Sequence, residues 1–476
     1  MRHRSESPVC LVGAGLLHHK KGDTAIAREN LYLNYGLLDL ATILHEAGYQ
    51  ARMLQGNSDE PSATVMKAMT TRLMEGPAPV LLSVPSALAL PWARGFCSAV
   101  RETLPEKLIV VGGRWVAQTD AEWLRVQLPD CNLVVFGTAE DRILQILDRQ
   151  LWSSIPGTSQ STRIEPFDST PRRVDYSLLD GYLRHWPSIE ISRGCGRGCA
   201  FCVEAKVPLG KPKSPVDTAR EMAFHEDTYQ CNPMRFYFEA SQFCPGAEWI
   251  REFVGAYVST GLRSEWRCET RADCLPRRDL EALASVGLKV LDIGLESASP
   301  RQLLAMRKCR DPAQYLGRAS DLLRGAHELG IQNKVNIMLY PGEDDDTVRE
   351  TIDWLEEHRP FIKGLSTGSL IVYRGRNGGL LAHIKKYGGA LVDETALDRE
   401  GACPLHLSAD YDHAKALEVA RRLSKSFMDA DAYYDLKSFC YFRRDLSRSE
   451  FHNIVQTIPS DAVSFRQPGE DFGLSV

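Results

Sequence analysis

Short apolar runs alternate with helical patterns along most of this 476-residue chain, and this alternation constrains its fold more than any other feature. In the first 150 residues, four apolar runs are each closed by glycine, proline or serine. Residues 35–49 repeat apolar side chains every three or four positions, which is typical of a helix. Strands that alternate with helices form parallel sheets, so we predict an α/β protein with a Rossmann-like, doubly wound domain over residues 1–150.

Ligands of such a sheet bind beyond the carboxyl ends of its strands. The sequence places small residues at these ends, namely Ser83, Gly112, Gly113 and Gly137. Residues 13–15 read Gly-Ala-Gly and lack the third glycine of a dinucleotide-binding fingerprint. We therefore interpret them as a tight turn between strand and helix rather than as a nicotinamide site.

The same alternation resumes in the second half of the chain. Apolar runs predict strands within residues 234–241, 265–273, 289–297, 334–343 and 364–373, with helices between them. We predict a barrel or partial barrel whose strand ends carry the chemistry. The expected organisation is a domain at 1–150, a linker rich in Ser, Thr and Pro at 151–187, the partial barrel at 188–375 and a mixed C-terminal lid or substrate region at 376–476.

Composition and charge exclude several classes of protein. The chain is 43% hydrophobic and 25% charged, and its net charge of −5 offers no basic surface for nucleic acid. The most apolar run, residues 78–93, is interrupted by prolines and too short to span a bilayer, so we interpret it as a buried strand followed by a loop. The N-terminus lacks the apolar core of a signal peptide, and we expect a cytoplasmic protein with reduced thiols.

Three of the thirteen cysteines, Cys195, Cys199 and Cys202, fall within eight positions. A structural zinc site usually has four ligands, and no fourth Cys or His lies at a matching offset. Three thiolates instead suit a 4Fe-4S cluster in which one iron has no protein ligand. An amine together with a carboxylate would chelate that open iron, and S-adenosylmethionine (SAM) carries both. The glycines between the cysteines would let the loop wrap closely around a cluster.

With the aromatic Phe201 directly before the third cysteine, this spacing resembles the signature of the radical SAM superfamily. The segments TRAD (270–273), GLES (294–297) and MLYPGE (338–343) follow in the order found in the subgroup with an N-terminal cobalamin-binding-like domain. The resemblance covers roughly residues 8–375. It implies a 4Fe-4S cluster and SAM as cofactors, and it leaves open whether cobalamin is bound.

The resemblance also implies roles for individual residues. Cys195, Cys199 and Cys202 would be the cluster ligands, and Phe201 would lie against the adenine of SAM. Glu296 and Arg271 would bind SAM or the substrate as catalytic candidates, and Gly342 would let the backbone approach the adenosine. For the two charged residues, a structural ion pair at the strand ends is the alternative.

Two features depart from the pattern of the family. Relatives often carry two carboxylates in the strand after the cluster, where this chain has Glu239, Ala240 and Ser241. Glu239 and Ser241 are therefore the candidates for holding the methionine end of SAM, with Gln242 as a substitute, although strand alternation would allow Glu239 to face away. The cobalamin-ligand motif is absent, and His18 and His19, which we expect to be solvated, are the nearby alternatives.

Two reactions follow from the resemblance. In the first, an adenosyl radical abstracts hydrogen from a small molecule such as a sugar, nucleoside or other secondary metabolite, and cyclisation, elimination or oxidation follows. The alternative is a cobalamin-dependent C-methyltransferase of natural-product or antibiotic biosynthesis. In the first reaction, hydrogen-donor candidates are Cys244, Cys268, Cys274 and Tyr373, for which buried packing is the simpler interpretation.

Partners follow the same reasoning. We expect a small-molecule substrate and a flavodoxin or ferredoxin as electron donor, with neither nucleic acid nor membrane involved. An RNA-modifying enzyme and an iron–sulfur sensor are less favoured, because the chain is acidic and carries adenosine-facing motifs. Residues 431–451 are rich in aromatic and arginine side chains, which fits a lid over a polar ligand or, more simply, an aromatic core with a charged face.

Overall fold

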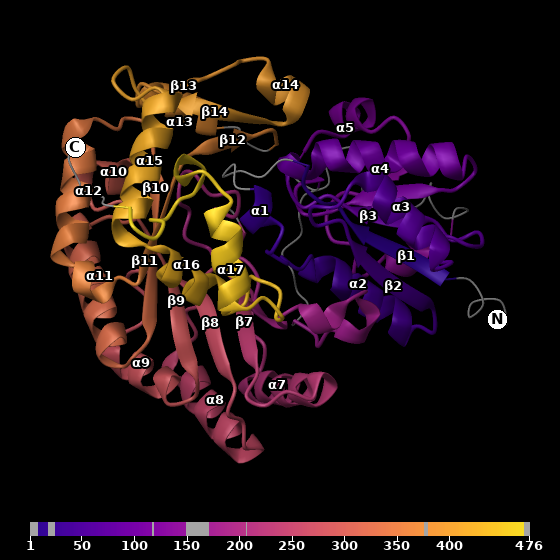
Figure 1. Cartoon of the computed structure of the whole chain (residues 1–476), viewed down its shortest axis with the longest axis horizontal. Helices are drawn as coiled ribbons and strands as arrows, with labels where there is room; N and C mark the ends of the chain where they lie inside the picture. The colour runs from indigo at the N-terminus through magenta and orange to yellow at the C-terminus, as the bar shows by residue number, and fades with distance from the viewer. Residues whose placement is uncertain are drawn as a thin grey trace.

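Two parallel sheets and a small antiparallel sheet form the framework of the molecule. The computed structural model describes residues 8–17, 24–116, 119–148, 171–205, 207–375 and 379–470. Figure 1 shows the N-terminal sheet and its helices on one side, the larger sheet with its outer helices on the other, and the C-terminal helices in front of the larger sheet. The predicted α/β architecture, with a Rossmann-like part followed by a partial barrel, is confirmed.

The N-terminal sheet contains five parallel strands in the order β2-β1-β3-β4-β5. Its strands are β1 (Pro8–Gly13), β2 (Gln50–Gln55), β3 (Val80–Ser83), β4 (Ile109–Gly112) and β5 (Leu133–Val134). The order reverses between β1 and β3, and ligands of doubly wound sheets bind at this switch point, beyond the carboxyl ends of the strands. The fold therefore directs a ligand to the edge where the predicted glycines lie.

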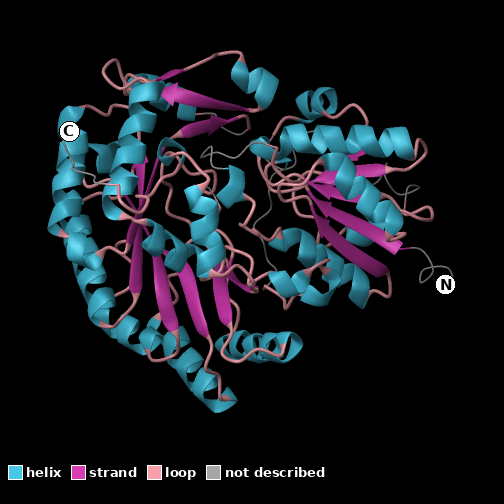
Figure 2. Cartoon of the chain, viewed as in Figure 1, coloured by secondary structure: helices cyan, strands magenta, loops and turns pink. Residues whose placement is uncertain are grey.

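Helices cover both faces of this sheet because its strands are apolar on both sides (Figure 2). Val9 and Leu11 of β1 belong to the core on the α2 side, whereas Cys10 and Val12 belong to the core that contains Phe96 of α4. The helices of this part are α1 (Thr24–Ala27), α2 (Tyr35–Glu46), α3 (Pro61–Thr70), α4 (Leu90–Thr103), α5 (Ala121–Gln127) and α6 (Ile143–Ile146).

The N-terminal part differs from the sequence interpretation in two places. The edge strand β2 was not predicted, because exposed Gln50 and Arg52 interrupt its apolar pattern. The interpretation of residues 78–93 as a strand and a loop is wrong in its second half. Residues after β3 form a 3-10 turn and then α4, since Pro91 occupies the first turn of that helix, where a missing N–H is tolerated.

The larger sheet has six parallel strands in the order β11-β10-β9-β8-β7-β6. Its strands are β6 (Ser188–Ser192), β7 (Arg235–Ala240), β8 (Glu265–Arg271), β9 (Leu288–Glu296), β10 (Gln332–Leu339) and β11 (Gly364–Ser369). Within the described ranges β6 and β11 do not pair with each other, so the sheet is an open, partial barrel. Because every strand is parallel, all six carboxyl ends lie at the same edge.

Helices pack on the outer face of the partial barrel (Figure 1). They are α7 (Pro215–Tyr229), α8 (Ala247–Thr260), α9 (Arg277–Ala284), α10 (Pro300–Ala305), α11 (Pro312–Glu328) and α12 (Asp345–Glu357). Local signals start them: the Ser214 side chain accepts from the Asp217 amide ahead of α7, and Asp344 and Thr347 form a capping box at α12.

Residues 364–373, predicted as one strand, form two strands in different sheets. After β11 the chain continues as β12 (Ile371–Tyr373), which joins β13 (Ala390–Leu391) and β14 (Ala402–His406) in the antiparallel sheet. The apolar pattern runs on through Leu370, so it does not mark the change of partner. Helices α13 (Leu380–Lys386) and α14 (Ala396–Glu400) accompany this sheet.

The last part of the described chain covers the inner face of the partial barrel. It contains α15 (His413–Phe427), α16 (Ala430–Ser438) and α17 (Arg448–Gln456). Phe442 and Phe451 form a core with Tyr237 and Val290, which project from β7 and β9. The aromatic residues of this segment are thus mainly a core. In the part of the chain that the structure describes, no helix is both long and apolar enough to cross a membrane.

Candidate active site

The three cysteines lie on the loop that follows β6, which we call the cysteine loop (residues 193–205 and 207–210). Gly194, Gly196 and Gly198 have φ values of 75°, 68° and 77°, which non-glycine residues rarely adopt. A Cβ at Gly194 would overlap the carbonyl oxygen of Pro208, where the loop folds back on itself. The Ala200 amide also donates to the Met306 carbonyl at 2.8 Å, so the loop is attached to the end of α10.

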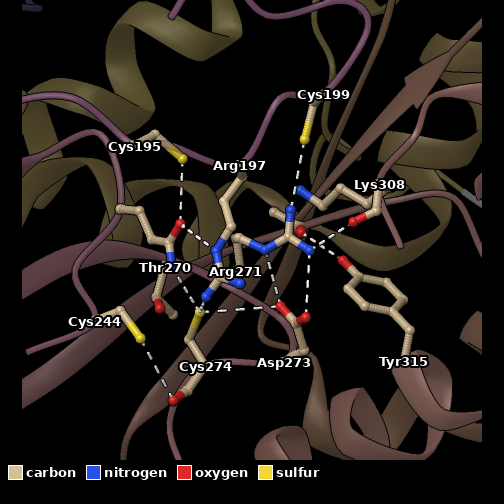
Figure 3. Close-up of polar contacts among 12 residues, drawn as sticks. Cys195, Arg197, Cys199, Cys244, Thr270, Arg271, Asp273, Cys274, Lys308 and Tyr315 are labelled. Atoms are coloured by element: carbon tan, nitrogen blue, oxygen red, sulfur yellow. Dashed lines mark hydrogen bonds and ion pairs between the residues drawn. The ribbon is translucent and has the colours of Figure 1, made fainter. Parts of the chain in front are cut away.

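Each thiol of the loop has a polar neighbour, and Figure 3 shows the contacts of Cys195 and Cys199. The Cys195 thiol lies 3.2 Å from Oε1 of Gln242, and Cys199 Sγ accepts from Nη1 of Arg271 at 3.5 Å. Cys202 Sγ accepts from the Glu204 amide at 3.4 Å. Burial raises the pKa of Cys202 to about 11, and the nearby Cys199 and Cys195 add to the shift. The thiols are therefore close enough to affect one another's charge.

No group of three or more His, Cys, Asp or Glu side chains in the described ranges converges as ligands of a single metal ion. A cubane does not require such convergence, because its three cysteines bind three different iron atoms. The residues present fit a cubane. Three thiols lie on one glycine-rich loop, and an arginine and a backbone amide each donate to one of the sulfur atoms. A mononuclear zinc site would lack a fourth ligand here.

Arg271, the last residue of β8, connects the cysteine loop to the barrel. Besides Cys199, its guanidinium binds Asp273 at 2.9 Å and donates to the Lys308 carbonyl at 2.7 Å. It also lies 5.7 Å from the ring centroid of Tyr315. Burial lowers the pKa of Arg271, but the hydrogen bond and charge of Asp273 outweigh that effect and keep the guanidinium charged. A permanent positive charge thus lies beside a thiol of the loop.

Glu296 ends β9, and its carboxylate pairs with Nζ of Lys308 at 3.0 Å. Its φ of 69° is in the left-handed region, which is strained for a glutamate and is enriched at functional sites. Lys308 therefore links the two predicted catalytic residues, because its backbone binds Arg271 and its side chain binds Glu296. The structure brings these residues together beside Cys199, while their predicted role toward SAM remains a prediction.

The residues predicted to contact adenosine come from the cysteine loop and from the turn after β10. Phe201 makes an edge-on contact with Tyr340 at 6.4 Å between ring centroids. Tyr340 is buried, and its hydroxyl has no hydrogen-bond partner in the part of the chain that the structure describes. Gly342 has a φ of 90°, and its amide donates to the Leu407 carbonyl at 2.8 Å. The predicted turn is therefore present next to Phe201, and its contact with adenosine stays a prediction.

A chamber of about 660 Å³ separates the N-terminal sheet from the cysteine loop and from β7. The carboxyl-edge residues predicted from sequence, Ser83, Gly112, Gly113 and Gly137, line one wall. Glu239 and Ser241 line the opposite wall, so Glu239 does not face away from the site. A second cavity of about 400 Å³ adjoins it at Asn34 and is lined in part by side chains of α16.

Two glutamates that line this chamber have raised pKa values. Burial, together with the charge of the neighbouring Glu269 on β8, raises the pKa of Glu239 to about 8. Burial also raises the pKa of Glu269, together with the charge of Asp292. Glu269 nevertheless exposes much of its surface, because that surface faces the chamber. The wall beside β7 and β8 can therefore hold a proton near neutral pH.

Several residues of the site were not predicted from the sequence, and some predicted candidates lie away from the site. Gln242, named only as a substitute, contacts Cys195, Arg197 and the Cys274 thiol, and neither Lys308 nor Asp273 was predicted. Their positions depend on how loops pack, which residue spacing does not report. Of the hydrogen-donor candidates, Cys268 is fully buried, Tyr373 lies on β12, and Cys244 and Cys274 adjoin each other beside Gln242. His18 and His19 lie outside the described residues.

Comparison with known proteins agrees with this geometry. Residues 189–355 match the radical SAM superfamily model. A curated relative, the hopanoid C-3 methylase of Methylococcus capsulatus, is 25% identical over 340 residues, which span 68% of this chain and 64% of that protein. The chain thus matches less than two thirds of the length of that relative.

Solved structures share the fold over nearly the whole chain. The radical SAM methyltransferase TsrM from Kitasatospora setae, with cobalamin and a [4Fe-4S] cluster bound, aligns with a TM-score of 0.63 at 16% identity, covering 94% of this chain and 90% of TsrM. The cobalamin-dependent SAM radical enzyme OxsB, with aqua-cobalamin and SAM bound, aligns with a TM-score of 0.59 at 15% identity, covering 95% of this chain and 66% of OxsB.

The three-cysteine loop and most strands of the partial barrel lie within the radical SAM domain at residues 189–355. The N-terminal part shares the fold of the corresponding part of the cobalamin-bound TsrM structure. The predicted 4Fe-4S cluster and SAM are the cofactors of this family. The prediction that the protein is an enzyme is confirmed, because its relatives with this domain are enzymes.

Proposed function

We propose that this protein is a cobalamin-dependent radical SAM methyltransferase that acts on a small molecule. The observation that carries the proposal is the chamber, which is lined by both the carboxyl edge of the N-terminal sheet and the residues around the cysteine loop. A cofactor on that sheet would be within reach of a substrate at the barrel edge. Two relatives are named as methylase or methyltransferase, and both solved relatives hold cobalamin, which favours methyl transfer over our first expectation of hydrogen abstraction alone.

Together, the bound groups would supply a reactive adenosyl radical and a methyl group. The residues of this chain hold and shield these groups. Cys195, Cys199 and Cys202 would hold the cluster, with Arg271 donating to the second thiolate. Gly112 lines the N-terminal wall of the chamber, where a Cβ would make an ordinary contact 3.7 Å from the Val135 carbonyl oxygen and a larger side chain would occupy the chamber. A corrin ring requires this wall to stay open.

On the opposite wall, Glu239 would bind the substrate or the polar end of SAM as a protonated carboxyl, because its pKa is about 8. A neutral carboxyl both donates and accepts a hydrogen bond, so it suits a hydroxyl or amide better than a second carboxylate. Such a wall favours a polar metabolite of a biosynthetic pathway over a pure hydrocarbon. A flavodoxin or ferredoxin would supply the electron.

The proposal is tested with the full chain, reconstituted with iron and sulfide without oxygen and mixed with hydroxocobalamin. We expect one cobalamin per chain and S-adenosylhomocysteine alongside 5′-deoxyadenosine when SAM and a reductant are added. Gly112→Leu fills the open wall and should reduce cobalamin binding while the iron content is kept. Gly255→Ala is the control, because nothing lies near that position on α8.

Absence of cobalamin binding, with 5′-deoxyadenosine as the only product, would reject the proposal. That outcome would favour hydrogen abstraction followed by cyclisation, elimination or oxidation. It would leave the N-terminal chamber without its proposed ligand.

A further inference from the structure

Both ends of the cysteine loop are attached to the N-terminal part of the molecule by ion pairs. Arg193 lies two residues before Cys195, and Glu204 lies two residues after Cys202. Arg193 pairs with carboxylates from α2 and from the turn after β5, whereas Glu204 pairs with Arg114 at the end of β4. The loop is therefore held by the opposite sheet as well as by its own barrel.

Arg193 is the better buried of the two attachment points. Its guanidinium binds Glu190 at 2.7 Å, Glu140 at 2.8 Å and Asp39 at 3.4 Å, and its side chain is only 13% exposed. Asp39 is almost fully buried and also pairs with Arg172 at 3.1 Å. Removing one member of a buried ion network leaves charges unpaired, so this contact constrains the loop more than a surface pair would.

The second attachment, the ion pair between Arg114 and Glu204, begins at a turn after β4 that requires glycine. Gly113 has a φ of 123°, and a Cβ there would lie 2.6 Å from the Val84 carbonyl oxygen. This turn directs Arg114 across the chamber to Glu204, whose side chain is 13% exposed. The Arg114 side chain lines the chamber and is 62% exposed, and its ordinary pKa is so high that the guanidinium stays charged.

The attachment points also line the chamber. Arg114, Glu140, Arg193 and Glu204 all contribute to its wall. A ligand that fills the chamber must therefore contact the residues that hold the cysteine loop. Groups that orient metal ligands affect metal affinity and spectroscopic properties even though they do not touch the metal.

We propose that Arg114 and Arg193 are positioning residues that hold both ends of the cysteine loop on the N-terminal sheet and couple occupancy of the chamber to the cluster. The coupling rests on the proposed function, since its ligand is cobalamin; the holding of the loop does not. Thermodynamic linkage makes the effect reciprocal, so an assembled cluster also strengthens cobalamin binding.

A charge exchange across the chamber tests the proposal. Arg114→Glu and Glu204→Arg each place like charges opposite one another, and the double variant restores an attractive pair in reversed orientation. Arg193→Met removes the other attachment, and Arg193→Lys keeps its charge. Arg94→Glu is the control, because Arg94 is exposed on α4 and, among the described residues, its hydrogen bonds go to Gln127.

The first measurement uses protein without cobalamin. Electron paramagnetic resonance (EPR) of the reduced cluster, before and after SAM is added, reports how the loop presents the cluster. We expect altered spectra for both single charge variants and for Arg193→Met, a wild-type spectrum for the control, and recovery in the double variant and in Arg193→Lys. Wild-type spectra in all variants would refute the role in holding the loop, and circular dichroism verifies that each variant is folded.

The second measurement is the rate at which a chelator removes iron from the oxidised cluster, with and without hydroxocobalamin. In the wild type we expect cobalamin to slow iron release by about tenfold, and we expect the single variants to lose this protection. Protection that persists in the single variants would refute the coupling. A wild type that binds no cobalamin would refute the coupling and the proposed function together, whereas the EPR comparison would still decide whether the arginines hold the loop.

Discussion

Arg271 shows how one side chain can affect both the cluster and the neighbouring strand ends. Its guanidinium reaches the Cys199 thiol, the Asp273 carboxylate and the Lys308 carbonyl from the end of β8. Hydrogen bonds and charges near the sulfur ligands are among the factors that set the reduction potential of a cluster. The residue is thus placed to tune electron uptake.

Arg271→Met should lower the reduction potential of the cluster by some tens of millivolts. Reduction adds negative charge, and the variant removes the positive charge that stabilises it while leaving Asp273 without its partner. An EPR-monitored redox titration measures the shift. Arg271→Lys should fall between the variant and the wild type, and an unchanged or higher potential in Arg271→Met would contradict the prediction.

The raised pKa of Glu239 makes stability depend on pH. The folded protein keeps this carboxyl protonated up to about pH 8, whereas the unfolded chain loses the proton near the ordinary value of 4.5. Between these values the folded state binds more protons, so the free energy of unfolding contributed by Glu239 falls as pH rises.

Glu239→Gln removes this dependence without changing the shape of the side chain. Compared with the wild type, the variant should gain stability between about pH 5 and pH 8, by roughly 1–3 kcal/mol because the carboxyl faces a chamber and is not fully desolvated. Urea unfolding of the cofactor-free protein at several pH values measures the difference. A difference that stays constant across this pH range would show that Glu239 is ionised in the folded protein.

The backbone of the cysteine loop requires glycine at several positions. Gly194, Gly196 and Gly198 all have positive φ, but of these only Gly194 also lacks space for a Cβ, because Pro208 approaches it. At Gly198 the nearest atom to a Cβ is 4.0 Å away. The two positions therefore separate the effect of crowding from the effect of φ.

Gly194→Ala should lose most of the cluster, whereas Gly198→Ala should keep most of it. Alanine at either site carries a φ strain of about 1 kcal/mol, but only at Gly194 must the loop also open to avoid Pro208. Iron and sulfide analysis after reconstitution gives the cluster content, with circular dichroism as the check on folding. Equal losses at both positions would mean that strain alone explains them.

Sequence patterns predicted the elements whose own residues show a clear apolar run or a characteristic spacing. Apolar runs indicated most strands of both sheets, and the spacing of Cys195, Cys199 and Cys202 indicated the cluster loop. The patterns failed at β2, where polar residues face solvent at a sheet edge, and after β11, where the partner changes without a break in the pattern. Lys308 was not predicted and Gln242 was named only as a substitute, because loop packing, not spacing, places them beside the cysteines.

The whole molecule is held together by polar contacts inside the partial barrel as well as by apolar cores. Arg267 of β8 is fully buried, pairs with Asp292 of β9 and donates to the Leu436 carbonyl of α16. Lys334 of β10 also binds Asp292, at 3.0 Å. This network connects three strands to a helix formed much later in the chain.

Arg267→Met should destabilise the protein by about 3–5 kcal/mol, because it leaves Asp292 short of one partner in a buried site. It should also speed hydrogen exchange in α16 more than in α8, which lies on the outer face. Urea unfolding and exchange mass spectrometry measure the two effects. Arg263→Met, at an exposed turn residue before β8, is the control, and similar results for both variants would contradict the prediction.

The position of α16 and α17 over the inner face of the partial barrel has a consequence for the order of events during synthesis (Figure 1). The strands that form this face leave the ribosome long before these helices, so the face stays uncovered while the intervening residues are translated. The smaller cavity, which α16 lines together with the end of β1, is therefore completed only when these helices dock, after every strand of both parallel sheets has been synthesised.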